Sequence, residues 1–399
     1  MHGYSILLAL LLLGPAPGAD HAAMGKQVDD LGSLRRAPVV HVADGWESRD
    51  GIRALFYESL PYRGKPTRVF AWYGAPGGAG KHPGVVLVHG GGGSAYREWV
   101  QKWVSHGFAA ISIAVEGQTD RREGKEWARH AWSGPARQGI YGDTFESLAD
   151  QWMYHAVGAT VLANSLLRSM PEVDPRRVGV AGISWGGVIT STVMGIDSRF
   201  AFAIPIYGCG HLHEIDNHWG KALHNNMVYR EVWAPELRLA RARMPALWLT
   251  WLLDPHFALD AQQKTQRAAR GERMVSVIPD MKHSHPAGWN PPDSYAFAEG
   301  IVRNGKPWLK QRSERRSGDL AVVEFESAKN VENAELVYTP DTGLTTNRKW
   351  SRAQAQVTRR GSRVEVRAEI PPGTRAAYFL LDCGGVYGSS ELMITAPGD

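Results

Sequence analysis

The 399-residue sequence contains only two cysteines, Cys209 and Cys383, which lie far apart in the chain. Two separate buried thiols are favoured over a disulfide, although an oxidising compartment would permit a bridge. No cluster of cysteine and histidine has the spacing of a zinc site. The sequence therefore predicts no disulfide framework, no metal site and no cofactor.

Strong charge of either sign is also missing. The formal net charge is +5, charged residues make up 21% of the chain, and the basic residues are scattered, with one local cluster at 312–316. Neither a single-faced basic stripe nor a recognised nucleic-acid-binding module is present, so we expect no nucleic-acid partner. The composition, with 43% apolar residues, is instead typical of a globular protein, and 399 residues are enough for one large and one small domain.

Long apolar runs are absent as well, with a partial exception at the amino terminus. Residues 6–13 are apolar without interruption, and small residues follow at 14–19. A run of this length is too short to span a membrane, which needs about 18 apolar residues or more. The pattern predicts a cleaved export signal over residues 1–19, with a retained anchor as the alternative. We therefore expect a secreted or periplasmic protein that is not bound to a membrane after cleavage.

Strand patterns alternate with helical patterns over most of the chain, which predicts a doubly wound, mainly parallel α/β sheet. The expected strands lie at 53–57, 67–73, 84–89, 108–113, 177–181, 200–207, 246–253 and 274–278. Helices are predicted over 94–106 and 144–170, and the polar stretch 117–142 is expected to be an inserted loop.

From about residue 311 the pattern changes to short alternating strands, which predicts a small antiparallel β sandwich. The expected organisation is a signal segment at 1–19, an α/β domain at 20–310 and a β sandwich at 311–399.

The most informative motif is Gly182-Ile183-Ser184-Trp185-Gly186, which lies between an apolar strand and a predicted helix. A strand, a Gly-x-Ser-x-Gly turn and a helix together form the context of a nucleophile elbow. The sharp turn needs small neighbours and presents the serine hydroxyl at the edge of the sheet. Ser184 is therefore the candidate nucleophile.

A serine hydroxyl needs a base to remove its proton and a carboxylate to orient that base. In chain order the acid and then the histidine are expected after the serine. Asp254 ends a core strand and is the candidate acid, with Asp260 as the alternative. His283 is favoured as the base over His285, because it lies closer to the end of the last strand.

The run His89-Gly90-Gly91-Gly92-Gly93 follows another predicted strand. Glycines let backbone N–H groups approach an oxyanion closely, and the lysine and hydroxyl residue of a phosphate-binding loop are missing here. The expected oxyanion donors are the backbone N–H groups of Gly91 and Trp185. His89 is expected to orient the run.

Together these segments resemble the dienelactone hydrolase and acetylxylan esterase-like branch of the α/β-hydrolase superfamily. The segments 89–93, 182–187, 207–210, 254–257 and 283–286 carry the resemblance, which extends over about residues 50–310. The β sandwich resembles the small domain appended to secreted members of that group. The segment 114–117 departs from the pattern, because it lacks the aspartate that is often found there, and the loop 117–142 is longer than expected.

The resemblance implies a serine esterase that acts on a small-molecule or carbohydrate ester. Trp132 and Trp219 are candidate substrate contacts, because they lie in polar loop sequence. Two other interpretations remain open at this point. One is a serine exopeptidase of the prolyl-oligopeptidase type, although the long propeller domain of such enzymes is missing. The other is a carbohydrate-binding envelope protein without catalytic activity.

Overall fold

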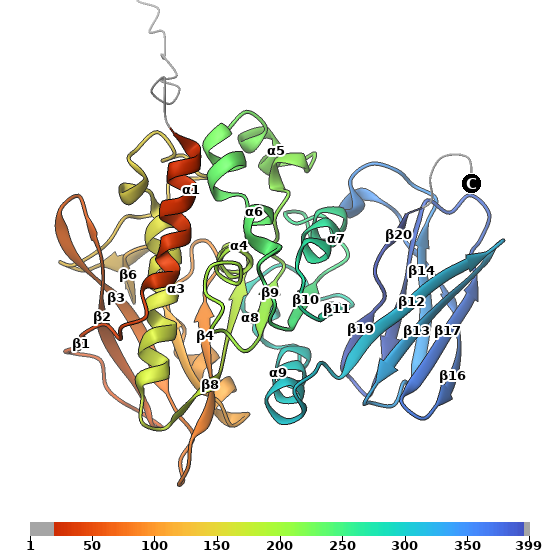
Figure 1. The fold of residues 1–399 in the computed structure, drawn as a ribbon, viewed down its shortest axis with the longest axis horizontal. Helices are drawn as coiled ribbons and strands as arrows, with labels where there is room; N and C mark the ends of the chain where they lie inside the picture. Colours follow the sequence, from red (N-terminus) through yellow and green to blue (C-terminus); the bar gives the residue numbers. More distant parts are fainter. Residues whose placement is uncertain (1–19, 395–399) are drawn as a thin grey trace, which may run out of the picture.

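The computed structural model describes residues 20–394, so the predicted signal segment lies outside the described residues. A mixed sheet forms the centre of the molecule (Figure 1). Its first nine strands are, in spatial order, β1 (Val40–Val42), β2 (Ile52–Tyr62), β3 (Lys65–Gly74), β5 (Ala109–Ile113), β4 (His82–Val88), β8 (Val173–Ile183), β9 (Ala203–Ile206), β10 (Ala246–Thr250) and β11 (Arg273–Val277). The strands from β5 to β11 run parallel, and β1 to β3 join them in antiparallel fashion.

Helices cover both faces of this sheet, as the alternating pattern predicts. The helices in the described part of the chain are α1 (His21–Asp30), α2 (Arg97–Ser105), α3 (Trp152–Ser169), α4 (Trp185–Val193), α5 (His218–Leu223), α6 (Glu236–Leu239), α7 (Leu259–Ala268), α8 (His285–Trp289) and α9 (Asp293–Asn304). Gly74 and Val85 both pair with Ala110, so they lie in one row of the sheet and share a face, and a Cβ atom on Gly74 would touch α2. Gly84 precedes Val85 and therefore faces the other side, where a Cβ atom on it would touch Leu167 of α3. The doubly wound α/β fold is thus confirmed.

The first two expected strands fall within β2 and β3, which form a hairpin with Arg63-Gly64 as its turn. Both residues have positive φ, 48° and 74°. Such a turn twists in the same sense as the two strands it joins, β2 and β3.

Two predicted elements differ from the structure. The long helix expected over 144–170 begins only at Trp152, because the Asp143 carboxylate accepts a hydrogen bond from the Trp152 N–H (2.5 Å) and a short 3-10 turn, η2 (Leu148–Asp150), precedes it. The helix is buried along most of its length, so it is not amphipathic. The polar stretch 117–142 contains a small hairpin, β6 (Gln118–Glu123) and β7 (Glu126–Arg129), rather than loop alone.

The C-terminal β segment, residues 309–394, forms two antiparallel sheets at the blue end of the chain (Figure 1). One contains β12 (Leu309–Ser317), β13 (Leu320–Ser327), β17 (Arg363–Glu369) and β16 (Gln356–Arg360). The other contains β19 (Tyr387–Ser389), β18 (Ala376–Asp382), β14 (Asn333–Thr339) and β15 (Ser351–Gln354), with β20 (Met393–Ile394) beside β18. Because Val275 of β11 pairs with Ser389 of β19, this second sheet continues the central one. The boundary between 310 and 311 therefore remains a prediction.

Candidate active site

Ser184 lies in the tight turn between β8 and α4, with φ 57° and ψ −115°, a backbone conformation unusual for a residue other than glycine. The flanking glycines are needed for space. A Cβ atom on Gly182 would lie 2.1 Å from the Gly186 carbonyl oxygen, and one on Gly186 would lie 2.1 Å from the carbonyl oxygen of Val88. The turn therefore has the geometry of a nucleophile elbow, with the serine above the ends of the parallel strands.

The structure brings together the three residues that the sequence singles out for nucleophilic chemistry. His283 Nε2 lies 3.0 Å from Ser184 Oγ, and His283 Nδ1 lies 2.7 Å from Asp254 Oδ2. Asp254 is buried, and its other oxygen accepts hydrogen bonds from the backbone N–H groups of His256 (2.8 Å) and Phe257 (3.0 Å). Both carboxylate oxygens are thus held in place. Such a chain can activate the serine hydroxyl.

The two alternative residues have other contacts. Asp260, at the start of α7, faces Arg348 of the C-terminal β segment at 3.3 Å. His285 Nε2 accepts a hydrogen bond from the backbone N–H of Gly90 (2.9 Å) and so supports the glycine run. His89 also supports this region, because its Nε2 accepts from the N–H of Val115 at 3.0 Å.

We predict that the protein loses stability as the pH falls from 6.5 to about 4. Burial lowers the pKa of both His89 and His285 to about 4, whereas the pKa of an ordinary histidine is 6.5. The unfolded chain therefore binds more protons in this window, so the free energy of unfolding decreases as the pH falls. For each imidazole the difference corresponds to about 3 kcal/mol.

Denaturant unfolding at about pH 7 and at about pH 4.5 measures this loss. His285→Gln is the matched control, because its amide oxygen keeps an acceptor for the Gly90 N–H but does not titrate. We expect a smaller loss in the variant, and an equal loss in both proteins would contradict the assignment.

The residues of the two expected oxyanion donors, Gly91 and Trp185, are in contact. A Cβ atom on Gly91 would lie 2.7 Å from Trp185 Cδ1, so the glycine run passes directly over the first residue of α4. One on Gly90 would lie 3.0 Å from the Cβ atom of Ser184, which places the run against the serine. Trp185 is the first residue of its helix, and the first N–H groups of a helix have no partner within it. The glycine run and the start of α4 thus both lie beside Ser184, and the roles of the Gly91 and Trp185 N–H groups remain predictions.

Sequence reasoning missed an ion pair beside this region. Arg137 Nε lies 3.0 Å from Glu116 Oε1, and the guanidinium carbon is 5.1 Å from the centre of the Trp185 ring. Burial raises the pKa of the Glu116 carboxyl, while the charge of Arg137 opposes this rise. A guanidinium here can bind a polar or anionic group of a ligand held at Ser184. The signals in the sequence were the missing aspartate in the segment 114–117 and the unusual length of the loop 117–142.

Aromatic and histidine side chains surround the base. The Tyr207 hydroxyl donates a hydrogen bond to the Lys282 carbonyl (2.7 Å), and the Tyr207 ring lies 4.4 Å from that of His283. His256 lies 4.7 Å from His283, ring to ring, and its Nδ1 is 3.3 Å from His218 Nε2. Burial lowers the pKa of both His218 and His256, which favours their neutral forms. Neutral imidazoles can donate to and accept from hydroxyl groups.

The two tryptophans predicted to contact substrate differ in their surroundings. Trp219 of α5 is buried, with its ring 4.8 Å from that of Trp185 and 5.3 Å from that of Phe257. It therefore packs against the residue that follows Ser184. Trp132 is 42% exposed, and the guanidinium of Arg68 stacks on its ring at 4.3 Å.

Cys209 and Cys383 are free and buried, and burial raises the pKa of the Cys383 thiol to about 12. Within residues 20–394, no three or more histidine, cysteine, aspartate or glutamate side chains are grouped as metal ligands. In the same part of the chain, none of the helices has the length and apolar character needed to cross a membrane.

The strand order, the elbow and the residues after β10 and β11 define an α/β hydrolase. Residues 53–233 match the model of the acetyl xylan esterase (AXE1) family, a range that includes Ser184 but neither Asp254 nor His283. The resemblance to acetylxylan esterase-like α/β hydrolases predicted from the sequence is therefore confirmed.

The chain is also similar to individual proteins that are named acetyl esterase or acetyl xylan esterase. Acetyl esterase Axe7A of Xylanibacter ruminicola is 21% identical over 200 residues, which cover 46% of this chain and 45% of the relative. The chain thus spans less than half the length of this curated relative. Acetyl xylan esterase 1 from Thermoanaerobacterium sp. JW/SL YS485 is 19% identical, with a TM-score of 0.54 over 68% of this chain and 90% of that one. The acetyl xylan esterase from Paenibacillus sp. R4 is 20% identical, with a TM-score of 0.51 over 68% and 91%. At this identity the two structures support the fold.

Proposed function

We propose that the protein is a serine carboxylic-ester hydrolase that works through an acyl-serine intermediate. The observation that carries this proposal is the continuous hydrogen-bonded chain from Ser184 through His283 to the buried Asp254. The match to the acetyl xylan esterase family supports an ester as the substrate. The glycine run beside the serine supports an acyl-transfer reaction, which requires a site for an oxyanion.

In the proposed mechanism Ser184 Oγ attacks the ester carbonyl carbon while His283 Nε2 takes the hydroxyl proton. The carbonyl oxygen becomes an oxyanion and accepts hydrogen bonds from the N–H groups of Gly91 and Trp185. Each such donor stabilises a transition state by about 3 kcal/mol. The C–O bond to the alcohol then breaks, and the alcohol leaves with the proton from His283. Water, deprotonated by His283, releases the acid and restores Ser184.

We propose an acetylated carbohydrate or another small acetyl ester as the substrate. Two relatives are named as acetyl xylan esterases and one as an acetyl esterase, which supports the acetyl group. The hydroxyl groups of a sugar could be bound by the neutral imidazoles of His218 and His256 beside the base. Export from the cytoplasm, expected from residues 1–19, remains part of this proposal.

A panel of substrates tests the proposal and its alternatives with one purified protein. It contains p-nitrophenyl acetate, p-nitrophenyl esters with longer acyl chains, acetylated and feruloylated xylo-oligosaccharides, a lactone and a dipeptidyl amide. We expect turnover of acetyl esters and little of the amide. Preference for the amide would favour an exopeptidase. Turnover of none of them, without labelling of Ser184 by a fluorophosphonate probe, would favour a binding protein.

A further inference from the structure

The C-terminal β segment shares a hydrophobic cluster with the part of the chain that carries the candidate acid. Leu259, the first residue of α7, and Val277 of β11 pack in one buried cluster with residues of β14 and β18. Those residues are Val337, Ala376, Tyr378 and Leu380. Because apolar side chains from both parts close this cluster together, neither part can move without exposing it.

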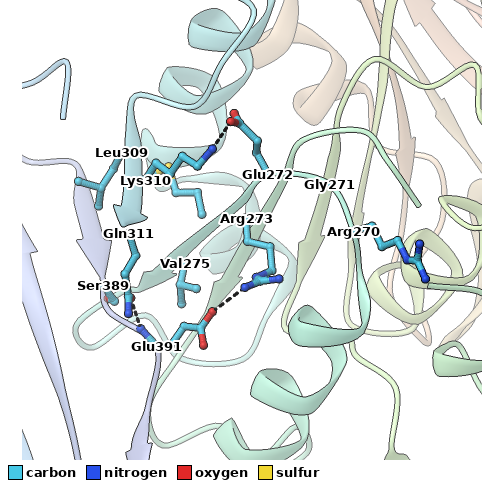
Figure 2. A pocket seen from close by; sticks show the side chains of 11 residues that line it. Arg270, Gly271, Glu272, Arg273, Val275, Leu309, Lys310, Gln311, Ser389 and Glu391 are labelled. Atoms are coloured by element: carbon cyan, nitrogen blue, oxygen red, sulfur yellow. Dashed lines mark hydrogen bonds and ion pairs between the residues drawn. The ribbon is translucent and has the colours of Figure 1, made fainter. Parts of the chain in front are cut away.

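Ion pairs also connect the region of β11 to the C-terminal β segment (Figure 2). Lys310 of β12 pairs with Glu272, and Arg273 pairs with Glu391 at 3.1 Å. Figure 2 also shows that the side chain of Arg270 lies apart from these pairs. Each pair joins a residue beside or within β11 to one of the C-terminal β segment. The ion pairs are partly exposed and contribute little individually, but they restrain the orientation of the segment.

One part of the C-terminal β segment reaches the loop of the candidate acid itself. We call residues 341–350, between β14 and β15, the contact loop. The hydroxyl of Thr346 donates a hydrogen bond to the backbone carbonyl of Asp254 (2.6 Å). Thr345 Oγ accepts one from the backbone N–H of Leu259 (2.9 Å), and Arg348 faces Asp260. The contact loop therefore holds both ends of residues 254–260.

The contact loop is itself ordered by internal hydrogen bonds. Its residues 345–347 form a 3-10 turn, η5 (Thr345–Asn347). The Arg348 guanidinium donates to the Gly343 carbonyl, with Nε at 2.9 Å, and the Trp350 indole donates to the Thr345 carbonyl at 3.1 Å. The Trp350 ring packs edge-on against Tyr378 of β18, 6.1 Å between centres. These contacts restrict the contact loop to one conformation, so it can keep residues 254–260 in place.

We propose that the C-terminal β segment positions Asp254 for catalysis, with Thr346 as the positioning residue. The inference rests on the proposed function, in which Asp254 orients His283. Thr346 binds the main chain of the same residue whose carboxylate lies 2.7 Å from His283. Loss of this bond frees the start of the loop, and a displacement of about 1 Å in a supporting group can lower a rate about 100-fold. Thr346 acts on the rate and not on substrate binding, because its contact is to Asp254.

Thr346→Val tests this role, because it keeps the shape of the side chain and removes the hydroxyl. We expect kcat for p-nitrophenyl acetate to fall about tenfold or more with little change in KM. The rate at which a fluorophosphonate labels Ser184 should fall in parallel. Thr346→Ser, which keeps the hydroxyl, should restore most of both rates. Thr358→Val, a change on the exposed strand β16, is the matched control and should leave both rates unchanged.

The outcomes separate this inference from the proposed function. Unchanged kcat and labelling in Thr346→Val would overturn the positioning role while the esterase activity stands. Equal losses in Thr346→Val and Thr346→Ser would also overturn it, since the hydroxyl would then not be responsible. If the wild-type protein labels at Ser184 but hydrolyses no ester, the proposed function fails, and the labelling rates of the variants still decide the role of Thr346. Thermal unfolding of each variant shows whether it is folded.

Discussion

Replacing Ser184 with alanine is expected to abolish ester hydrolysis while leaving the fold intact. The reaction then has no nucleophile, and we expect kcat for p-nitrophenyl acetate to fall by about 10⁴-fold or more. Stability should change little, because Ser184 Oγ is hydrogen-bonded to His283 rather than to the core. The φ of 57° is equally unfavourable for serine and alanine, so the backbone strain also stays the same. Steady-state kinetics and thermal unfolding measure the two effects.

Ser105→Ala is a suitable control for this variant, because Ser105 lies exposed at the end of α2 and bonds only to its own helix. It should retain the full rate. Residual activity in Ser184→Ala at the wild-type level, in protein free of wild-type enzyme, would show that another residue attacks the ester. The fluorophosphonate probe gives a second measurement, since it should label wild-type protein and the control but not Ser184→Ala.

The local parts of the site could be predicted from the sequence because short-range sterics determine them. The elbow needs glycines at 182 and 186, because a Cβ atom at either position would lie 2.1 Å from a backbone oxygen. The motif of five residues, 182–186, is therefore enough to predict the turn. The positions of Asp254 and His283 followed from a rule of topology. The carboxyl ends of adjacent parallel strands meet at one edge of the sheet, and these residues follow the adjacent strands β10 and β11.

The parts that could not be predicted depend on contacts between distant segments. Thr346 lies 92 residues from Asp254, and their contact depends on the register of β14, β18 and β19 against the central sheet. No period or motif in the sequence encodes that register. The position of Arg137 beside Trp185 could not be predicted either, because it depends on the path of the loop 117–142. The helix start at Trp152 was missed because Asp143 caps it from nine residues away, outside the usual capping pattern.

Asp254→Asn is the second substitution expected to have a very large effect, and the hydrogen bonds around Asp254 show why. Its Oδ1 accepts from two backbone N–H groups, those of His256 and Phe257, and its Oδ2 faces His283. In an asparagine the carbonyl oxygen must keep the two backbone donors, so the NH₂ group must face His283 Nδ1. That nitrogen can then only accept, and the proton moves to Nε2, which can no longer take the proton of Ser184.

We therefore expect Asp254→Asn to lower kcat about 10⁴-fold with a small change in KM, although the side chain keeps its size. Labelling of Ser184 by the fluorophosphonate should slow to a similar extent, because both reactions need the same proton transfer. Asp319→Asn, in an exposed turn of the C-terminal β segment, provides the control for the loss of one negative charge. If both Asp254→Asn and Asp319→Asn keep the wild-type rate, Asp254 does not set the tautomer of His283. Thr346 would then have no catalytic group to position, so this variant also tests the proposed role of the contact loop.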